Sequence, residues 1–358
     1  MIKAVIRHKD FIYRRPATTS RGIYLTKKVF YILLFHAEDP SIFGIGECSL
    51  FPGLSMDDVP DFEKKLKEII NLINKGWFDL NNTVSSWPSI NFALETAVKD
   101  LEQRGSKILY PSDFTLGKDS ILINGLIWMD NREDMKKQIK LKLKEGFHCL
   151  KLKIGAIDFA EEINLIKYIR SKFTENDLEI RVDANGAFST NEALEKLKIL
   201  ADFELHSIEQ PIIPTQLEAM ASLCAIAPLP IALDEELLGK YPIENRRKLL
   251  EIIKPQYIVL KPGLLGGISA CEEWIKVANE FDIGWWVTSA LESNIGLNAI
   301  AQWTYTLKNP MPQGLSTGKL FEKNISSPLA VNGEKLYYLP RKKWDTSFFT
   351  SNHTGYEN

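Results

Sequence analysis

Beyond about residue 120, short apolar runs alternate with longer segments whose apolar residues recur at helical spacing. Runs such as "PIALDE", "YIVLKP" and "GWWVTSA" are typical of parallel strands that are buried on both faces. The series begins with a strand at "ILINGLIW" and ends with a short strand at "QGLSTG". It makes eight strand-helix steps, with the last helix missing or replaced. We therefore predict a parallel barrel of the α/β class.

The first hundred or so residues follow a different pattern. "IKAVIRHKDFIYRR", "GIYLTKKVFYILLFHAED" and "FGIGECS" predict three strands rich in β-branched and aromatic residues. Two helices are expected next, one ending at Gly76 and one that starts after Pro88 and ends at Gly105. We predict an α+β domain at 1–118, the barrel with the catalytic residues at 119–318, and a C-terminal return segment at 319–358 that packs with the first domain.

An open, doubly wound sheet is the alternative fold for the strand-helix series. Its usual glycine-rich nucleotide motif has little support in this chain. Gly44-Ile45-Gly46 is a GxG without a third glycine or a following helix, so we interpret it as a turn in a strand.

Composition narrows the function classes. The net charge of -2 and the pI near 6.3 do not indicate a nucleic-acid surface. The four cysteines are scattered without a CxxC pair, which argues against a disulfide framework or a zinc site. The N-terminus lacks a signal-peptide pattern and no apolar run reaches about 18 residues. We expect a cytoplasmic enzyme that binds neither membrane nor nucleic acid, with its oligomeric state left open.

Polar side chains recur at the carboxyl ends of the predicted barrel strands. They follow one another at intervals of 25 to 30 residues, which is one strand-helix unit each time. Active-site groups of such barrels collect at this end of the strands, so we expect these side chains to converge on one mouth. They are Lys151 and Lys153, Asp183, Glu209, Asp234, Lys261 and Ser289.

Three of these side chains are acids on successive strands. Converging carboxylates repel one another unless a cation lies among them, and oxygen ligands without histidine or cysteine favour Mg²⁺, with Mn²⁺ as a substitute. We predict that Asp183, Glu209 and Asp234 bind one Mg²⁺. The alternative is that each acid caps the following helix or pairs with a lysine.

The lysines suggest acid-base chemistry. In "CLKLKIG", Lys151 and Lys153 share one face of a strand, which taken alone is typical of a water-exposed edge strand. Next to a metal and to each other, lysines have a lowered pKa and can act as bases. A base facing a metal-bound carboxylate indicates removal of the proton α to that carboxylate, with the metal stabilising the enediolate. A barrel that only binds a carboxylate, without catalysis, is a remote alternative.

The order KxK, D, E, D, K resembles the enolase superfamily, specifically its muconate-lactonizing subgroup. The resemblance implies a modified TIM barrel, (β/α)7β, with an N-terminal α+β capping domain. Within the subgroup, "INGLIWM", "SRG" in "TTSRGIYLTKK" and "SALESNIGL" resemble the o-succinylbenzoate synthases of menaquinone biosynthesis.

This resemblance implies a lyase. The reaction is the Mg²⁺-dependent dehydration of 2-succinyl-6-hydroxy-2,4-cyclohexadiene-1-carboxylate to 2-succinylbenzoate. Lys153 would take the α-proton and return a proton to the leaving hydroxyl group, and Lys261 would stabilise the anionic intermediate. Lys151 would stay charged and lower the pKa of Lys153.

The resemblance also implies substrate contacts at Ser289 and Arg21. Arg181 either lies near a substrate carboxylate or forms an internal ion pair. Residues 16–28 either fold over the barrel mouth or form an ordinary hairpin connection. A racemase of N-acylamino acids or a dipeptide epimerase stays open, because both use the same pair of lysines. Ser289-Ala290-Leu291 lacks the DxD that dipeptide epimerases carry there, which counts against dipeptides.

Overall fold

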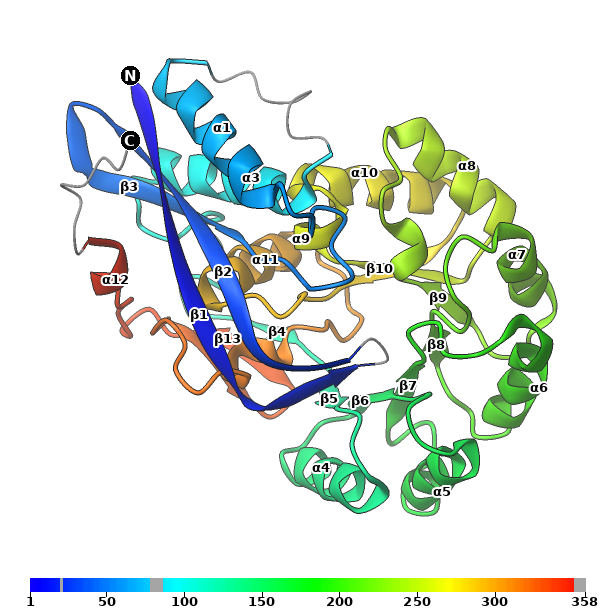
Figure 1. Cartoon of the computed structure of the whole chain (residues 1–358). Coiled ribbons are helices and arrows are strands. Elements are labelled where there is room, and N and C mark those ends of the chain that lie inside the picture. Colours follow the sequence, from blue (N-terminus) through cyan, green and yellow to red (C-terminus); the bar gives the residue numbers. More distant parts are fainter. Residues whose placement is uncertain (20–21, 78–85, 351–358) are drawn as a thin grey trace.

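The computed structural model describes residues 1–19, 22–77 and 86–350 (Figure 1). Its N-terminal part is an antiparallel sheet of β1 (Ile2–Thr19), β2 (Gly22–His36) and β3 (Asp39–Cys48) in that order. Helices α1 (Phe62–Asn74) and α3 (Pro88–Glu102) follow. Both helices begin and end inside or close to the predicted bounds, and together with the sheet they form the cap.

The larger part is a curved parallel sheet. Among the described residues it has seven strands, and neighbours in the sheet are also neighbours in the order of the chain. The strands are β5 (Gly125–Ile127), β6 (Cys149–Lys153), β7 (Glu179–Asp183), β8 (Ser207–Glu209), β9 (Ile231–Leu233), β10 (Tyr257–Leu260) and β11 (Gly284–Val287).

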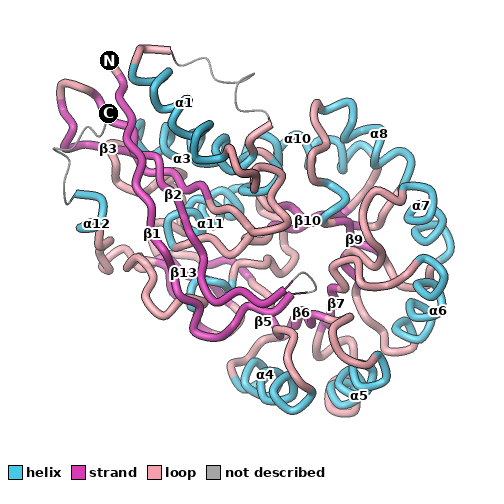
Figure 2. The backbone as a smooth tube through the Cα atoms, viewed as in Figure 1, coloured by secondary structure: helices cyan, strands magenta, loops and turns pink. Residues whose placement is uncertain are grey.

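Helices follow the strands and form an outer layer, as Figure 2 shows. This arrangement confirms the predicted α/β barrel. The helices are α4 (Arg132–Lys144), α5 (Phe159–Arg170), α6 (Thr190–Ala201), α7 (Leu217–Ile226), α8 (Ile243–Ile253), α9 (Pro262–Leu265), α10 (Gly267–Glu280) and α11 (Asn294–Thr306).

Within the described part of the chain, the ring of strands closes without a regular eighth strand. Gln313 pairs with Ile123 and Gly314 pairs with Thr288, each as a single parallel bridge. The chain then enters the short 3₁₀ helix η2 (Ser316–Lys319). The prediction of a strand at "QGLSTG" is therefore wrong, because only its first two residues bond to neighbouring strands.

The first predicted barrel strand, "ILINGLIW", divides into two. β4 (Ser120–Leu122) pairs with the hairpin β12 (Leu329–Asn332) and β13 (Lys335–Tyr338), whereas β5 joins the barrel. Between them, the N–H of Asn124 donates to the carbonyl of Gln313, which takes the chain from one sheet to the other. The prediction of a single strand is wrong for this reason.

The two close glycines of β3 have a packing role. Gly44 and Gly46 lie within the strand, so the predicted turn is wrong. A Cβ on Gly46 would lie 1.7 Å from the carbonyl oxygen of Ala93, and one on Gly44 would lie 2.0 Å from that of Ala97. Glycine is needed at both positions because the backbone of α3 packs directly against the strand.

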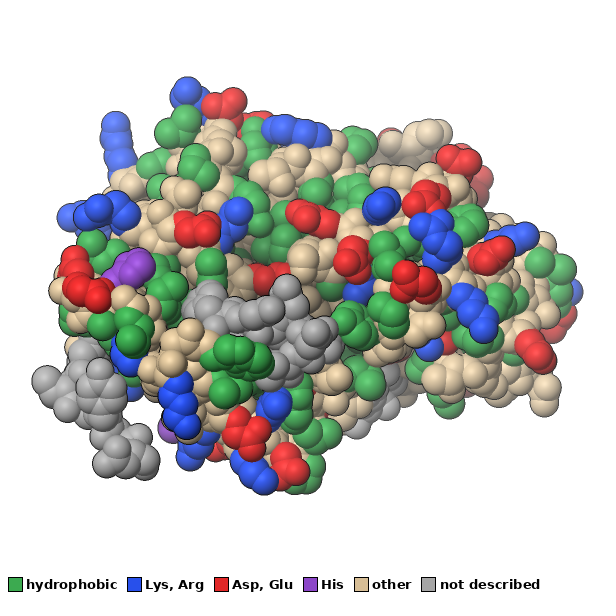
Figure 3. Space-filling model, turned by 90° about the horizontal axis from the view of Figure 1, so that it is seen from above, with side chains coloured by type: hydrophobic (Ala, Val, Ile, Leu, Met, Phe, Trp, Pro, Cys, Tyr) green, Lys and Arg blue, Asp and Glu red, His purple; other side chains and the backbone are tan. Residues whose placement is uncertain are grey.

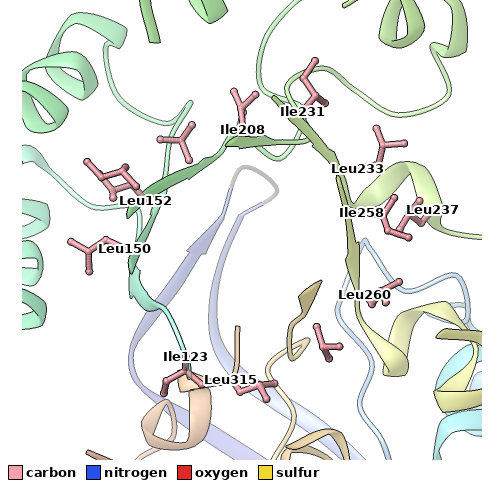
Figure 4. Close-up of a cluster of buried hydrophobic side chains, with 14 of the residues drawn as sticks. Ile123, Leu150, Leu152, Ile208, Ile231, Leu233, Leu237, Ile258, Leu260 and Leu315 are labelled. Carbon is pink, nitrogen blue, oxygen red and sulfur yellow. The ribbon is translucent and has the colours of Figure 1, made fainter. Parts of the chain in front are cut away.

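The hydrophobic core of the barrel lies between the strands and the helices. Figure 4 shows Leu150 and Leu152 pointing outward from the ring, on the side of the helices. Since side chains alternate along a strand, Lys151 and Lys153 face the opposite side. β6 lies between β5 and β7, so the edge-strand interpretation of "CLKLKIG" is excluded.

The C-terminal segment contacts both parts of the chain. Its hairpin pairs with β4, whereas Phe321 packs on Phe11 and Tyr13 of β1 with ring centroids 4.8 and 4.9 Å apart. Helix α12 (Ser347–Thr350) brings Phe349 to 5.1 Å from the ring of Tyr31. The domain boundaries at 118 and 318 stay a prediction.

The surface and the cysteines agree with an ordinary globular composition. Acidic and basic side chains are mixed over the face seen in Figure 3. Cys48, Cys149, Cys224 and Cys271 are buried free thiols. Within the described ranges, no helix is both long and apolar enough to cross a membrane.

Candidate active site

A cavity of about 80 Å³ lies at the carboxyl ends of the barrel strands, between the barrel and the cap. Phe51 and Leu54 line it from the cap, and aromatic and polar side chains line it from the barrel. The barrel residues that matter for the chemistry below are Lys151, Lys153, Asn185, Lys261, Ser289 and Thr317, with Trp128, Leu264 and Trp286 as apolar walls.

Strand register brings the predicted acids together. Lys153 pairs with Asp183 across β6 and β7, and Asp183 pairs with Glu209 across β7 and β8. Glu209 pairs with Ala232 of β9, two residues before Asp234. The three acids therefore occupy neighbouring strand ends, as their spacing predicts. All three are buried.

The lysines of β6 reach these acids directly. The Nζ of Lys151 lies 2.7 Å from Oδ2 of Asp183 and 2.5 Å from Oε2 of Glu209. The Nζ of Lys153 lies 2.6 Å from the same oxygen of Asp183 and donates to Oδ1 of Asn185 at 2.7 Å. The two ammonium groups thus share one carboxylate, which explains how two adjacent lysines are tolerated on one strand face.

Lys261 approaches the acids from β10. It forms an ion pair with Asp234, and its Nζ lies 3.8 Å from Oε1 of Glu209. Burial alone would lower the pKa of Lys261, but Asp234 and Glu209 outweigh burial and raise it above its usual value. Burial likewise opposes the charge of Lys151, and its acid partners again raise the pKa.

The pKa values of Asp183 and Glu209 are shifted in opposite directions. Burial would raise the pKa of Asp183, but Lys151 and Lys153 hold it well below its usual range. Burial and the charge of Asp183 raise the pKa of Glu209 to about 8, even with Lys151 beside it. Oε1 of Glu209 is buried without a hydrogen-bond partner. Glu209 therefore has a carboxylate oxygen available for a further ligand. The positive charge around Glu209 is too small to hold its pKa at the usual value.

These features fit a hard divalent cation. The donor set is oxygen only, and a cation at Glu209 would satisfy the unpartnered oxygen. In the present arrangement the acids turn toward lysines. Among the described residues, no three His, Cys, Asp or Glu side chains are grouped closely enough to enclose a metal. The acids would have to turn from the ammonium groups to the ion.

Two residues that support the site were missed by the sequence reasoning. Asn185 accepts from Lys153 and donates from Nδ2 to Oε1 of Glu235 at 3.0 Å. Oε1 of Gln210 accepts from the backbone N–H groups of Asp234, at 3.2 Å, and of Glu236, at 3.1 Å. Both lie one or two positions after a predicted ligand, in "DANG" and "EQP", which is the signal that could have found them.

The remaining predicted residues have different outcomes. Ser289 lines the cavity, and its Oγ lies 2.6 Å from Oγ1 of Thr317. Arg21 lies outside the described residues. Residues 16–19 and 22–28 belong to the hairpin of β1 and β2, which pair as far as Thr19 and Gly22. That this segment folds over the barrel mouth stays a prediction.

Arg181 forms the internal ion pair. Its Nε donates to Oε1 of Glu179 at 2.6 Å, and its Nη1 donates to the carbonyl of Pro312 at 2.9 Å. The guanidinium lies 4.4 Å from the ring centroid of Trp286 and is 1% exposed. Trp286 lines the cavity, whereas Arg181 does not. This packing favours the ion-pair alternative over contact with substrate.

Known proteins are similar to this chain in sequence and in fold. The family model described as Enolase C-terminal domain-like matches residues 134–341. The o-succinylbenzoate synthase of Desulfotalea psychrophila is 46% identical over an alignment that covers 91% of this chain and 96% of that protein. The chain belongs to the enolase superfamily, in its o-succinylbenzoate synthase family. It is accordingly a lyase. The superfamily was predicted from the strand-end residues, and the o-succinylbenzoate synthase family, with its lyase class, from the motifs "INGLIWM", "SRG" and "SALESNIGL". Both predictions are confirmed.

Solved structures of the superfamily confirm the fold. The crystal structure of MenC from Desulfotalea psychrophila aligns with a TM-score of 0.82 at 42% identity, over 94% of this chain and 99% of that one. The muconate lactonizing enzyme of Pseudomonas fluorescens, complexed with muconolactone, aligns with a TM-score of 0.79 at 21% identity. That alignment covers 98% of this chain and 97% of the other. The o-succinylbenzoate synthase family thus shares its cap and barrel with enzymes of other activities.

Proposed function

We propose that the cavity dehydrates 2-succinyl-6-hydroxy-2,4-cyclohexadiene-1-carboxylate to 2-succinylbenzoate, with Mg²⁺ as the metal and Mn²⁺ as a substitute. The proposal is supported by the 46% identity to the o-succinylbenzoate synthase of Desulfotalea psychrophila, and the placement of Lys153 and Lys261 supplies the geometry that the reaction needs. Both line the cavity, from β6 and β10, and the strands between them carry the three acids. A carboxylate held at the acids would therefore have a lysine on each side.

Asp183, Glu209 and Asp234 would hold the metal ion. When bound, the ion would draw the substrate carboxylate to this end of the cavity and stabilise the negative charge that develops on it. The ion would also relieve the unfavourable surrounding of Glu209, whose buried Oε1 has no partner. Gln210, which bonds the backbone N–H of Asp234, would keep that ligand in place.

Lys153 would move the proton. In its neutral form, its Nζ takes the proton from ring carbon 1, next to the carboxylate, and the electrons of that bond form the new ring double bond to carbon 6. The bond from carbon 6 to the hydroxyl oxygen breaks, and Lys153 returns its proton to that oxygen, which leaves as water. Asn185 accepts from the Nζ of Lys153 and would orient it between these two positions.

Lys261 would act on the substrate from the side of its six-membered ring opposite to Lys153. Its ammonium group would stabilise the anionic intermediate by charge and by contact with the ring face. Phe51, Leu54 and Trp128 line the cavity and would exclude water from the reacting atoms. The hydroxyl groups of Ser289 and Thr317 would face the succinyl tail. We place the enzyme in the cytoplasm, acting on this small-molecule substrate.

Turnover of the cyclohexadiene substrate tests the proposal. The full chain with Mg²⁺ should form the aromatic product, followed by its ultraviolet absorbance. In parallel, N-succinylamino acids are incubated with the enzyme in ²H₂O and checked for exchange of the α-proton, which a racemase would catalyse with the same two lysines. Exchange without any dehydration would overturn the proposal in favour of a racemase.

A further inference from the structure

A buried lysine joins the cap to one wall of the cavity. Lys27 lies on β2 and is 3% exposed. Its Nζ donates to the carbonyl oxygens of Ala290 and Leu291, at 2.8 Å each. Ala290 and Leu291 follow β11 and line the cavity. A cap side chain therefore holds the backbone of a barrel segment that borders the substrate space.

This barrel segment has a strained backbone. Leu291 has φ = 62°, in the left-handed region, which costs a residue with a side chain about 1–2 kcal/mol. On the other side of the segment, the N–H of Ala290 donates to Oε2 of Glu292 at 2.7 Å. Such a conformation persists only where neighbouring groups over-determine it, and Lys27 and Glu292 do so here.

The hydrogen bonds from Lys27 also determine which groups of the Ala290–Leu291 segment are available to a ligand in the cavity. Both carbonyl oxygens are committed to the ammonium group, and Lys27 itself does not line the cavity. Free carbonyl oxygens at this wall would repel an anionic chain. The wall is left with the apolar side chains of Ala290 and Leu291, beside the hydroxyl group of Ser289.

The same ammonium group touches the cap wall of the cavity. The Nζ of Lys27 lies 5.8 Å from the ring centroid of Phe51, which lines the cavity together with Leu54. Lys27 therefore lies where the cap wall and the barrel wall meet, and it fixes the position of one wall relative to the other.

Burying the ammonium group of Lys27 close to Glu292 and Glu47 costs free energy of desolvation. Burial lowers the pKa of Lys27 to about 8, while Glu292 and Glu47 act in the opposite direction. Glu47 accepts from the N–H groups of Ser293 and Gly296 at the start of α11, each at 2.7 Å. Apolar side chains could join two domains without burying such charges. The cost is consistent with a task beyond holding the domains together.

We propose that Lys27 is a positioning residue that holds the Ala290–Leu291 wall in the shape required by the succinyl tail of the substrate. This inference rests on the proposed function, because it names the part of that substrate which the wall meets. Lys27 contacts no reacting atom, so its influence falls on binding of the tail rather than on proton transfer at the ring.

Three variants test this role. Lys27→Met removes the charge and both hydrogen bonds, Lys27→Arg keeps the charge with a different geometry, and Lys28→Met is the matched control. Lys28 is the neighbouring lysine, exposed and bonded to Glu63 at 2.6 Å. For each protein, kcat and KM are measured with the cyclohexadiene substrate, together with the dissociation constants of 2-succinylbenzoate and of benzoate, which lacks the tail.

In Lys27→Met, KM and the dissociation constant of 2-succinylbenzoate should rise about tenfold, with kcat within about threefold of the wild type. Benzoate binding should not change, Lys27→Arg should lie between Lys27→Met and the wild type, and Lys28→Met should match the wild type. A merely structural role would lower the melting temperature and leave these binding constants unchanged, which would overturn the proposal. If Lys27→Met does not fold, Lys27→Arg decides in the same way.

The binding measurements separate this inference from the proposed function. A wild type that binds 2-succinylbenzoate but does not dehydrate the substrate contradicts the proposed function, and the Lys27 variants still test the wall. A wild type that dehydrates the substrate, with variants whose binding of 2-succinylbenzoate is unchanged, contradicts only the role of Lys27. A wild type that neither binds nor turns over contradicts both.

Discussion

Lys153 and Asp183 are register partners on neighbouring parallel strands, and the Nζ of Lys153 lies 2.6 Å from Oδ2 of Asp183. The proposed base and a proposed metal ligand are therefore adjacent because β6 and β7 pair as they do. A shift by one residue would turn Lys153 to the side of the helices. The proposed chemistry at the carboxyl ends of the barrel strands therefore depends on strand register as much as on residue type.

Metal binding should depend strongly on Asp234. In Asp234→Asn, the affinity for Mg²⁺ should fall about 100-fold, because a neutral amide replaces a carboxylate at the ion. Isothermal titration calorimetry with Mg²⁺ measures this. Asp202→Asn, at an exposed acid that ends α6, is the control and should bind Mg²⁺ as the wild type does. Equal affinities for the two variants would remove Asp234 from the ligand set.

Replacement of Lys261 should slow the chemical step. Lys261→Met should lower kcat about 100-fold with little change in KM, since its ammonium group is proposed to stabilise charge that forms only during the reaction. Steady-state kinetics with the cyclohexadiene substrate separate the two constants. A loss confined to KM would show instead that Lys261 binds the substrate in its ground state.

Glu292 should make stability depend on pH. Burial, helped by Glu47 and opposed by Lys27, raises the pKa of Glu292 from 4.5 to about 7. Between these values the folded chain keeps a proton on Glu292 that the unfolded chain has released. The free energy of unfolding therefore falls as the pH rises from 4.5 to about 7.

The variant Glu292→Gln should lose this component. Its free energy of unfolding relative to the wild type should change by up to about 3 kcal/mol across that window. Urea unfolding curves at several pH values measure the difference. Parallel pH profiles for the two proteins would show that Glu292 ionises in the folded state as it does in the unfolded chain.

Gly46 should be sensitive to the smallest substitution. In Gly46→Ala, the new Cβ would lie 1.7 Å from the carbonyl oxygen of Ala93, so α3 has to move away from β3. We expect the free energy of unfolding to fall by about 1–3 kcal/mol. Urea unfolding at neutral pH measures this, and an unchanged midpoint would mean that α3 is free to shift at no cost.

Much of the barrel and of the site could be predicted from the sequence, because both follow from local patterns. Apolar runs mark the strands, and one polar group per strand end marks the mouth. Pairing between distant segments could not be predicted in this way. "ILINGLIW" divides because Asn124 bonds to Gln313, and the glycines of β3 make sense only once α3 packs on them.

The supporting residues of the site were missed for the same physical reason. Lys27 lies more than 260 positions before the carbonyl groups it holds, and nothing near Lys27 in the sequence indicates that contact. Its neighbour Lys28 has the same residue type and is exposed. Only the packing of the cap on the barrel distinguishes the two.

The most direct test of the central claim is turnover by Lys153→Ala. With Mg²⁺ binding confirmed as intact by calorimetry, this variant should form no 2-succinylbenzoate from the cyclohexadiene substrate, whereas Lys140→Ala, at an exposed lysine of α4, should match the wild type. Formation of 2-succinylbenzoate by Lys153→Ala at a rate near that of the wild type would contradict the role of Lys153 as the base.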